Sequence, residues 1–526
     1  MVVEKRRDCG LPYEKQLVLP LKFNVESTGR GEDGLKQADA FRLPDETQGR
    51  VSKVLVHATS RRRLKLVDSL AGKFSGADFY VMHTPQQKEA VEKLKEKYGG
   101  RVRLVEVDLV SGWAQDSVFA LENPAYGLTA LMAAVKGKDG LHAASGFMRR
   151  AEQKTPKIFA EKMPGIFGQL NRRERGLRLR YFEGGDIQAD ESNVFVGEET
   201  LRVNIVRKMI SLKREKEALF YRGFRGYESF WSDRIMDNQQ EVVEKVAEKT
   251  QLPIELVKME GEYNSRGELE FYWEGEKVAE SERYTHKFIA TPFLVKPPSQ
   301  QEKQQHLEQM DPGRREEISR MEKQVRDFES YLEDGVSSKT VEGIKRGVRK
   351  KIEKISGNKR VVFVGLPKAP YFHLDMYMKP LGGGKIVLAS NKAGLESLTY
   401  RDKEGAASSI LDEMDRFMPD ARLNEVGGEL EGKGFEVVRM PALMPCSRTA
   451  ACTHATYCNV ELEQYEEGGR LVKKVYSPTY GITSLDAEAK RRWEQLGYEF
   501  QDVGDLSDIS KNKGSLRCCL KVLERK

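Results

Sequence analysis

Short apolar segments of strand length alternate with amphipathic segments of helical length at both ends of this chain. Near the N-terminus, a predicted strand at 53–58 is followed by a helix at 62–74 and a strand at 78–83. This pattern continues in the C-terminal part, with predicted strands at 360–367, 385–390, 435–440, 457–462, 471–476 and 498–503 and a helix at 485–497. Such alternation is typical of folds in which helices cover a sheet. We therefore predict an α/β fold.

The composition excludes several classes of protein. Lys and Arg total 88 and Asp and Glu total 81, so the formal net charge of +7 over 526 residues is too small to indicate nucleic-acid binding. No apolar run approaches the ~20 residues of a membrane-spanning helix, and the first residues lack the apolar region of a secretory signal. Six cysteines are too few for a disulfide scaffold in a chain of this length. These features predict a cytoplasmic protein without a membrane or nucleic-acid partner.

Three regions fall outside the alternation. Residues 1–50 are polar and predict an irregular N-terminal arm. The basic stretch 143–180 predicts a solvated helical insertion at about 124–176, and the alternative is a patch for an acidic partner. A second insertion is predicted at about 215–355, where apolar residues recur at helical spacing in a charged tract, namely Met310, Ile318, Met321, Val325, Phe328 and Leu332. We expect this helical tract to lie on its own domain, so that 51–526 forms one body with two insertions.

Four short motifs carry residues that could perform chemistry. They are Trp113-Ala-Gln-Asp116, Glu183-Gly-Gly-Asp186, His373-Leu-Asp375 and Gly514-Ser-Leu-Arg-Cys518. Each alone is weak, because a turn, a capping carboxylate or an inert thiol explains it equally well. Together they supply a cysteine nucleophile, a histidine that exchanges protons near neutral pH and carboxylates that suit the planar fork of a guanidinium group. The combination predicts attack by sulfur on a guanidinium carbon.

In this order the motifs resemble those of the guanidino-modifying enzymes, the pentein superfamily. This group includes arginine, agmatine and protein-arginine deiminases, dimethylargininases and amidinotransferases. Its members typically show Trp/Phe-x-x-Asp, Glu-Gly-Gly-Asp/Asn/Ser, His-x-Asp and a late Gly-x-x-His/Arg-Cys. The resemblance covers residues 50–123, 177–210 and 360–526, approximately. It implies a five-bladed β/α propeller with helical insertions and with the active site in a central channel.

The resemblance also implies roles for individual residues. Cys518 would attack the guanidinium carbon, and His373, oriented by Glu183, would protonate the departing amine and then activate water. The expected catalytic residues are Asp116, Glu183, His373, Asp375 and Cys518. The expected substrate-binding residues are Trp113, Asp116, Asp186, Asp375 and Lys513. Hydrolysis of the covalent thiouronium intermediate would give a ureido product and ammonia, and no metal or organic cofactor is implied.

Several departures from the family pattern bear on the substrate. Gln115 stands where arginine and agmatine deiminases usually have Arg, and in this the motif looks more like protein-arginine deiminases. Ser117 and Phe119 occupy places where animal members carry calcium-binding acids, which argues against calcium activation. Lys513 replaces an Arg that binds the carboxylate of free arginine, and Arg517 replaces the commoner His before the nucleophile. The substrate stays open between peptidyl-arginine and agmatine-like compounds.

Other interpretations remain open at this stage. An amidinotransferase or a dimethylargininase would use the same intermediate with another acceptor or leaving group. A propeller without catalysis could serve as a binding or regulatory protein, and the chain could form a homo-oligomer. Cys446, Cys452, His454 and Cys458 could bind zinc, although their spacing fits no common finger and packing is the better explanation.

Two adjacent cysteines compete for the role of nucleophile. The late motif selects Cys518 over Cys519. A strand is predicted over 516–522, on which successive side chains face opposite ways. Cys518 would then share a face with Leu516 and Leu520, and Cys519 would point away from the site.

Overall fold

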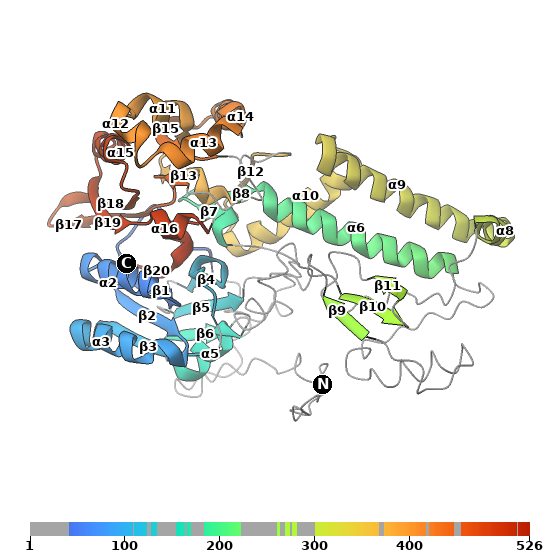
Figure 1. The fold of residues 1–526 in the computed structure, drawn as a ribbon, viewed down its shortest axis with the longest axis horizontal. Helices are drawn as coiled ribbons and strands as arrows, with labels where there is room; N and C mark the ends of the chain where they lie inside the picture. Colours follow the sequence, from blue (N-terminus) through green and yellow to red (C-terminus); the bar gives the residue numbers. More distant parts are fainter. Residues whose placement is uncertain are drawn as a thin grey trace.

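The chain forms an α/β fold, as the sequence predicts (Figure 1). A computed structural model describes most of its body and a few isolated elements. The described residues are 42–108, 110–123, 128–133, 154–163, 166–169, 184–221, 260–263, 269–273, 276–280, 300–367, 373–416, 420–445, 454–512 and 514–526.

Five sheets of the described structure share one pairing pattern. In each sheet the first strand runs antiparallel to the second, and the second runs parallel to the third. The strands, sheet by sheet, are β4 (Val118–Asn123), β5 (Leu128–Ala133) and β6 (Phe167–Gln169); β7 (Ile187–Ala189), β8 (Asn193–Gly197) and β12 (Arg360–Val364); β13 (Met378–Gly382), β14 (Lys385–Ser390) and β15 (Glu436–Leu443); β17 (Glu461–Glu467), β18 (Arg470–Thr479) and β19 (Glu499–Asp505); and β20 (Leu520–Arg525), β1 (Val51–Ala58) and β2 (Asp78–His83). The last sheet joins the first and the last described strand of the chain, because β20 pairs with β1 (Figure 1).

Helices connect the second strand of each sheet to the third, as parallel pairing requires. The connecting helices are α5 (Thr155–Lys162); α6 (Glu198–Tyr221), α8 (Gln300–Gln309), α9 (Pro312–Asp334) and α10 (Lys339–Ser356); α11 (Asn391–Ser397), α12 (Tyr400–Glu404), α13 (Ser408–Arg416) and α14 (Asp420–Gly432); α15 (Thr483–Gln495); and α2 (Arg61–Lys73). The helix α2 shows why they form: Ser60 caps its N-terminus, and Leu66 and Leu70 bury one face against the sheet.

The remaining elements extend this framework. They are η3 (Pro85–Gln87), α3 (Lys88–Tyr98), η4 (Gly99–Arg101), β3 (Val102–Glu106), β9 (Glu260–Tyr263), β10 (Leu269–Trp273), β11 (Glu276–Glu280), β16 (Ala455–Thr456) and α16 (Ser507–Ser510). The strands β9 to β11 form a separate three-stranded sheet. No helix among the described residues is long and apolar enough to cross a membrane.

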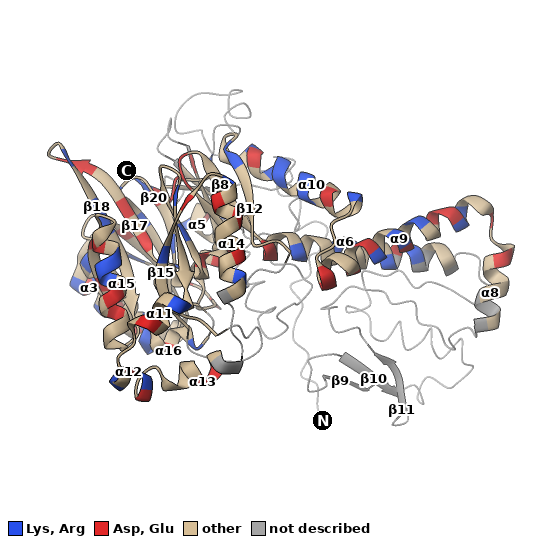
Figure 2. Cartoon of the chain, turned by 90° about the horizontal axis from the view of Figure 1, so that it is seen from above, with Lys and Arg blue, Asp and Glu red and all other residues tan. Residues whose placement is uncertain are grey.

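The charged tract before β12 folds as helices, as its apolar spacing predicts. Asp311 caps α9, and Gly335 ends it in the left-handed conformation at φ 77°. Buried residues of α9 form an apolar cluster with Leu201 and Leu212 of α6, so the tract packs on its own chain. Together α6, α8 and α9 reach away from the sheets (Figure 1). Acidic and basic residues are interspersed along α9 (Figure 2), consistent with a solvated outer face.

The structure corrects several sequence-based predictions. Part of the predicted insertion at 124–176 is integral to the first sheet, since β5 and β6 pair with β4 there. The strand predicted at 457–462 begins only at Glu461, and residues 457–459 form a bend. Of the N-terminal arm, 42–50 is described and contains no helix or strand, only isolated bridges.

Candidate active site

The residues of interest lie in short segments that directly precede the first strand of each sheet. These segments are η5 (Ala114–Asp116) before β4, η7 (Gly184–Asp186) before β7, η9 (Leu374–Met376) before β13, the bend 457–459 before β17, and α17 (Leu516–Cys519) before β20. The segments η5, η7, η9 and α17 contact one another in sequence-distant pairs. Four motifs that are far apart in the chain are thus brought together by their equivalent places in a repeated unit.

Cys518 lies at the centre of this group and is 4% exposed. Its Sγ is 3.8 Å from Oδ2 and 3.9 Å from Oδ1 of Asp375. Asn459 donates a hydrogen bond from Nδ2 to the same sulfur at 3.3 Å and a second to the backbone carbonyl of Asp375 at 3.2 Å. The thiol is therefore held between a carboxylate and an amide.

The local structure around the two cysteines differs from the predicted strand. Residues 516–519 form a turn of helix, and the strand starts at Leu520. The two thiols nevertheless point apart, as predicted, because neighbours on a helical turn face different directions. The Sγ of Cys519 contacts the Nη1 of Arg63 at 3.0 Å and the carbonyl of Ser515 at 3.2 Å. The hydrogen-bond partners of Cys519 thus differ from those of Cys518.

Two buried carboxylates lie close enough for the charge of one to act on the other. Asp375 is 0% exposed and Asp116 is 5% exposed. An oxygen of Asp116 accepts a hydrogen bond from the backbone N–H of Gly185 at 3.2 Å. Burial raises the pKa of Asp375, and the negative charge of Asp116 raises it further, while Arg517 and His373 oppose both. Two carboxylates buried this close together favour a cationic ligand between them.

The same buried carboxylates favour a cationic ligand next to the thiol of Cys518. Burial raises the pKa of Cys518 well above its ordinary value, and the charges of Asp375 and Asp116 raise it further. The resting sulfur is therefore protonated at neutral pH. A guanidinium ion bound beside these carboxylates would offset their charge and favour the thiolate at the moment when it is needed.

The two glycines of the second motif allow the segments to approach closely. A Cβ on Gly184 would lie 2.0 Å from the carbonyl oxygen of Gln115, whose side chain in turn donates to the carbonyl of Gly184 at 3.0 Å. A Cβ on Gly185 would lie 2.6 Å from Nδ1 of His373 and 3.2 Å from Oδ1 of Asp375. The side chains of His373, which is 3% exposed, and Asp375 therefore both lie next to Gly185.

Replacing Gly185 with alanine should therefore lower kcat/KM by about 10²-fold, because the new methyl must displace His373 or Asp375 by roughly 1 Å. Gly428 in α14 is a matched control, since nothing lies within 4 Å of a Cβ there. Steady-state kinetics and thermal unfolding of both variants check this. Full activity of a folded Gly185→Ala enzyme would show that the imidazole and the carboxylate need not stay in place.

Other predicted site residues have different surroundings. The carboxylate of Asp186 accepts a hydrogen bond from the backbone of Thr200 at 2.6 Å, at the start of α6. This contact caps the helix, and the charge of His373 also acts on Asp186, so its role in substrate binding stays a prediction. Trp113 packs against Gly514, where a Cβ would meet its ring at 2.3 Å, and it also stacks under Arg63 at 4.4 Å. Glu183 and Lys513 lie outside the described residues.

Two of the four residues of the possible zinc site, His454 and Cys458, are described. Cys446 and Cys452 lie outside the described residues, while Cys458 and His454 are buried. Burial raises the pKa of Cys458, which disfavours a thiolate ligand. Among the described residues no group of three or more His, Cys, Asp or Glu side chains could hold a metal ion.

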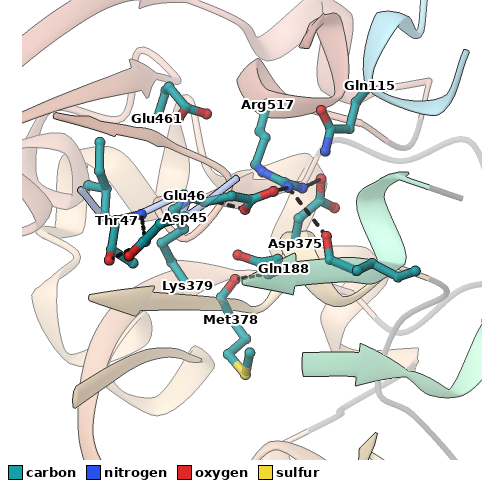
Figure 3. Close-up of polar contacts among 12 residues, drawn as sticks. Asp45, Glu46, Thr47, Gln115, Gln188, Asp375, Met378, Lys379, Glu461 and Arg517 are labelled. Atoms are coloured by element: carbon teal, nitrogen blue, oxygen red, sulfur yellow. Dashed lines mark hydrogen bonds and ion pairs between the residues drawn. The ribbon is translucent and has the colours of Figure 1, made fainter. Parts of the chain in front are cut away.

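Sequence analysis missed three residues that contact this site. Asn459 was expected on a strand, yet it lies in the bend before β17, at the place equivalent to the other site residues. Arg517 was noted only as a departure, but its Nη1 donates to Oδ2 of Asp375 at 3.0 Å. Glu46, from the N-terminal arm, accepts from the Nη2 of Arg517 at 2.5 Å (Figure 3). No sequence pattern pointed to Glu46, because 471 positions separate it from Arg517.

Comparisons with known proteins find distant similarities among solved structures. No protein-family model matches the chain, and no curated protein does either. Among solved structures, agmatine deiminase from C. jejuni is similar at 11% identity and a TM-score of 0.45, over 91% of this chain and 95% of that one. Agmatine deiminase from Enterococcus faecalis is similar at 10% identity and a TM-score of 0.47, over 93% and 97%. Similarity at this level does not establish an activity, which depends on the side chains of the site.

Proposed function

We propose that the chain is a hydrolase that deiminates the guanidino group of an arginine-type substrate to a ureido product and ammonia. The observation that carries this proposal is the placement of the Cys518 thiol 3.8 Å from the buried carboxylate of Asp375, with Asp116 close enough to raise the pKa of both groups. Carboxylates in this position can hold the nitrogens of a guanidinium group and leave its carbon facing sulfur.

The reaction would proceed through a covalent intermediate. Once the substrate is bound, the Cys518 thiol gives its proton to His373, and the thiolate forms a bond to the guanidinium carbon. One C–N bond then breaks as His373 gives this proton to the departing ammonia. Water then attacks the thiouronium carbon while His373 takes a proton from it, and the C–S bond breaks. The products are the ureido compound, ammonia and the free thiol, so one water is consumed for each ammonia released.

The fold offers a physical reason for this arrangement. Five sheets of equal pairing pattern each present a short segment at the start of their first strand, and we propose that they surround a common axis as a β/α propeller. The N-terminal arm 1–50 and the two insertions, about 124–176 and 215–355, would lie away from this axis. The exceptions are β5 and β6, which belong to the first sheet, and residues 42–50, which contact the sheets. The substrate would be peptidyl-arginine or an agmatine-like compound.

A panel of guanidino compounds tests the proposal. Ammonia and ureido product are measured with agmatine, free arginine and a blocked peptidyl-arginine, each with and without glycine or ornithine as an acceptor, and with methylated arginine. We expect equimolar ammonia and ureido product from at least one unmethylated compound. Transfer to an acceptor that outpaces ammonia release would indicate an amidinotransferase, and methylamine release would indicate a dimethylargininase. Turnover of none would contradict an enzymatic role.

A further inference from the structure

The N-terminal segment 42–50 lies against several of the sheets rather than standing free of the body. Its backbone donates hydrogen bonds from Leu43 to the carbonyl of Ile355 at 2.7 Å, from Glu46 to that of Ala189 at 2.9 Å, and from Gly49 to that of Gln464 at 2.7 Å. The acceptors belong to α10, β7 and β17. The segment is therefore fixed by three elements at once, and Glu46 lies in the middle of it.

The side chain of Glu46 points inward from this segment toward Arg517 (Figure 3). Its Oε1 accepts from Nη2 of Arg517 at 2.5 Å, and its Oε2 is 3.6 Å from Nζ of Lys379. Burial alone would raise the pKa of Glu46, but the cations of Arg517 and Lys379 outweigh it and lower that pKa to about 2. Glu46 is therefore ionised at neutral pH.

The guanidinium group of Arg517 joins two carboxylates from distant parts of the chain. Its side chain is 2% exposed, and its two terminal nitrogens divide between Asp375 and Glu46. The same nitrogens also contact the carbonyls of Gly184 at 3.5 Å and Ile187 at 3.4 Å. Arg517 is thus surrounded by protein acceptors, and its planar fork spans two of them at fixed angles, which a lysine could not do.

Resting on the proposed function, we propose that Glu46 and Arg517 are a positioning pair that keeps Asp375 ionised and oriented for the substrate guanidinium. The arm residue thereby supports a catalytic group that it does not touch. Among the charged groups that face Asp375, Arg517 is the strongest influence opposing the effect of burial on its pKa. The others are His373, Asp116 and Cys518, all from neighbouring segments.

The test compares pH profiles of kcat/KM for Arg517→Met, Arg517→Lys and Glu46→Gln enzymes. Removing the cation in Arg517→Met should move the acidic limb upward by about one pH unit or more, while Arg517→Lys should keep the limb near its wild-type place. Since His373, Asp116 and Cys518 are retained in each variant, a difference between profiles reports Arg517. The Glu46→Gln variant should lower kcat/KM about tenfold, because the guanidinium of Arg517 loses the carboxylate that holds it in place. The acidic limb of its pH profile should stay where it is, because the cation of Arg517 remains.

A buried glutamate outside this pair provides the matched control. Glu461 is unsuitable because its charge acts on Arg517, so the control is Glu463→Gln: Glu463 is 3% exposed and its carboxylate accepts hydrogen bonds from the backbone of Val51 and the hydroxyl of Tyr476, both at 2.7 Å. Its loss should lower the melting temperature without moving the limb. If Glu46→Gln fails to fold, the double variant Glu46→Gln/Lys379→Met removes one charge of each sign and should restore folding but not kcat/KM.

The outcomes separate the two proposals. A wild-type enzyme that turns over no guanidino compound would overturn the deiminase proposal and this one with it. An active wild-type enzyme whose limb is unchanged in Arg517→Met would overturn the positioning pair alone. Wild-type kcat/KM in the Glu46→Gln enzyme or in the double variant would also overturn it. So would an equally large shift of the acidic limb in the Glu463→Gln control.

Discussion

Replacing Cys518 with serine should lower turnover of the guanidino substrate by about 10³-fold or more, whereas serine at position 519 should cost about tenfold or less. The two residues are adjacent and equally buried, so the difference isolates the direction of each thiol. The Sγ of Cys518 lies beside Asp375 and Asn459. The Sγ of Cys519 is held by Arg63 and would be replaced there by a hydroxyl that accepts the same hydrogen bond.

Ammonia release measured over several hours gives enough range to see such a loss, and thermal unfolding shows whether both variants fold. Comparable activity in the two variants, or a larger loss at position 519, would mean that the nucleophile has been assigned to the wrong residue.

Replacing Asp375 with asparagine should lower kcat/KM by about 10²-fold to 10³-fold. A hydrogen bond between charged groups contributes about 1.5–3 kcal/mol, and each 1.4 kcal/mol is about tenfold. The change also deprives the buried Arg517 of one of its two counter-charges, and breaking a buried pair is costly. Asp402 provides the control, since its carboxylate bonds with Thr399 and Ser484 and with no site residue.

The same carboxylate predicts how activity depends on pH. Burial raises the pKa of Asp375, so the neutral form appears at a higher pH than for an exposed aspartate. Affinity for a cation is present above this raised pKa and falls as pH decreases through it. The wild-type profile of kcat/KM should therefore show an acidic limb that is absent in Asp375→Asn. An identical limb in both enzymes would assign it to another group.

The α/β class and the order of the motifs could be read from the sequence because each depends on local signals. The strands are apolar runs, and the motifs place Asp, His and Cys at fixed short spacings. The five-fold repetition of sheet pairing could not be seen, since the units share topology and not residues. The equivalence of Asn459 with Asp116, Asp375 and Cys518 appears only when each is placed before the first strand of its sheet.

The errors around the nucleophile and the arm also have physical causes. Residues 516–522 alternate in a way that suits a strand, and a helical turn over Leu516–Cys519 is too short to show a helical period. As a result, the side chain of Arg517 reaches Asp375. On a strand it would have pointed to the opposite face from Cys518. The role of Glu46 depends on a contact across nearly the whole chain, which no local pattern encodes.

The central claim is that the sulfur of Cys518 bonds to the guanidinium carbon during turnover. Wild-type and His373→Asn enzymes are mixed with the substrate found in the panel, quenched with acid at short times and weighed by mass spectrometry. We expect an added mass equal to the substrate less ammonia, and fragmentation of the tryptic peptide 518–521 should place it on Cys518. An adduct on Cys519, or turnover with no adduct in either enzyme at any quench time, would contradict the mechanism.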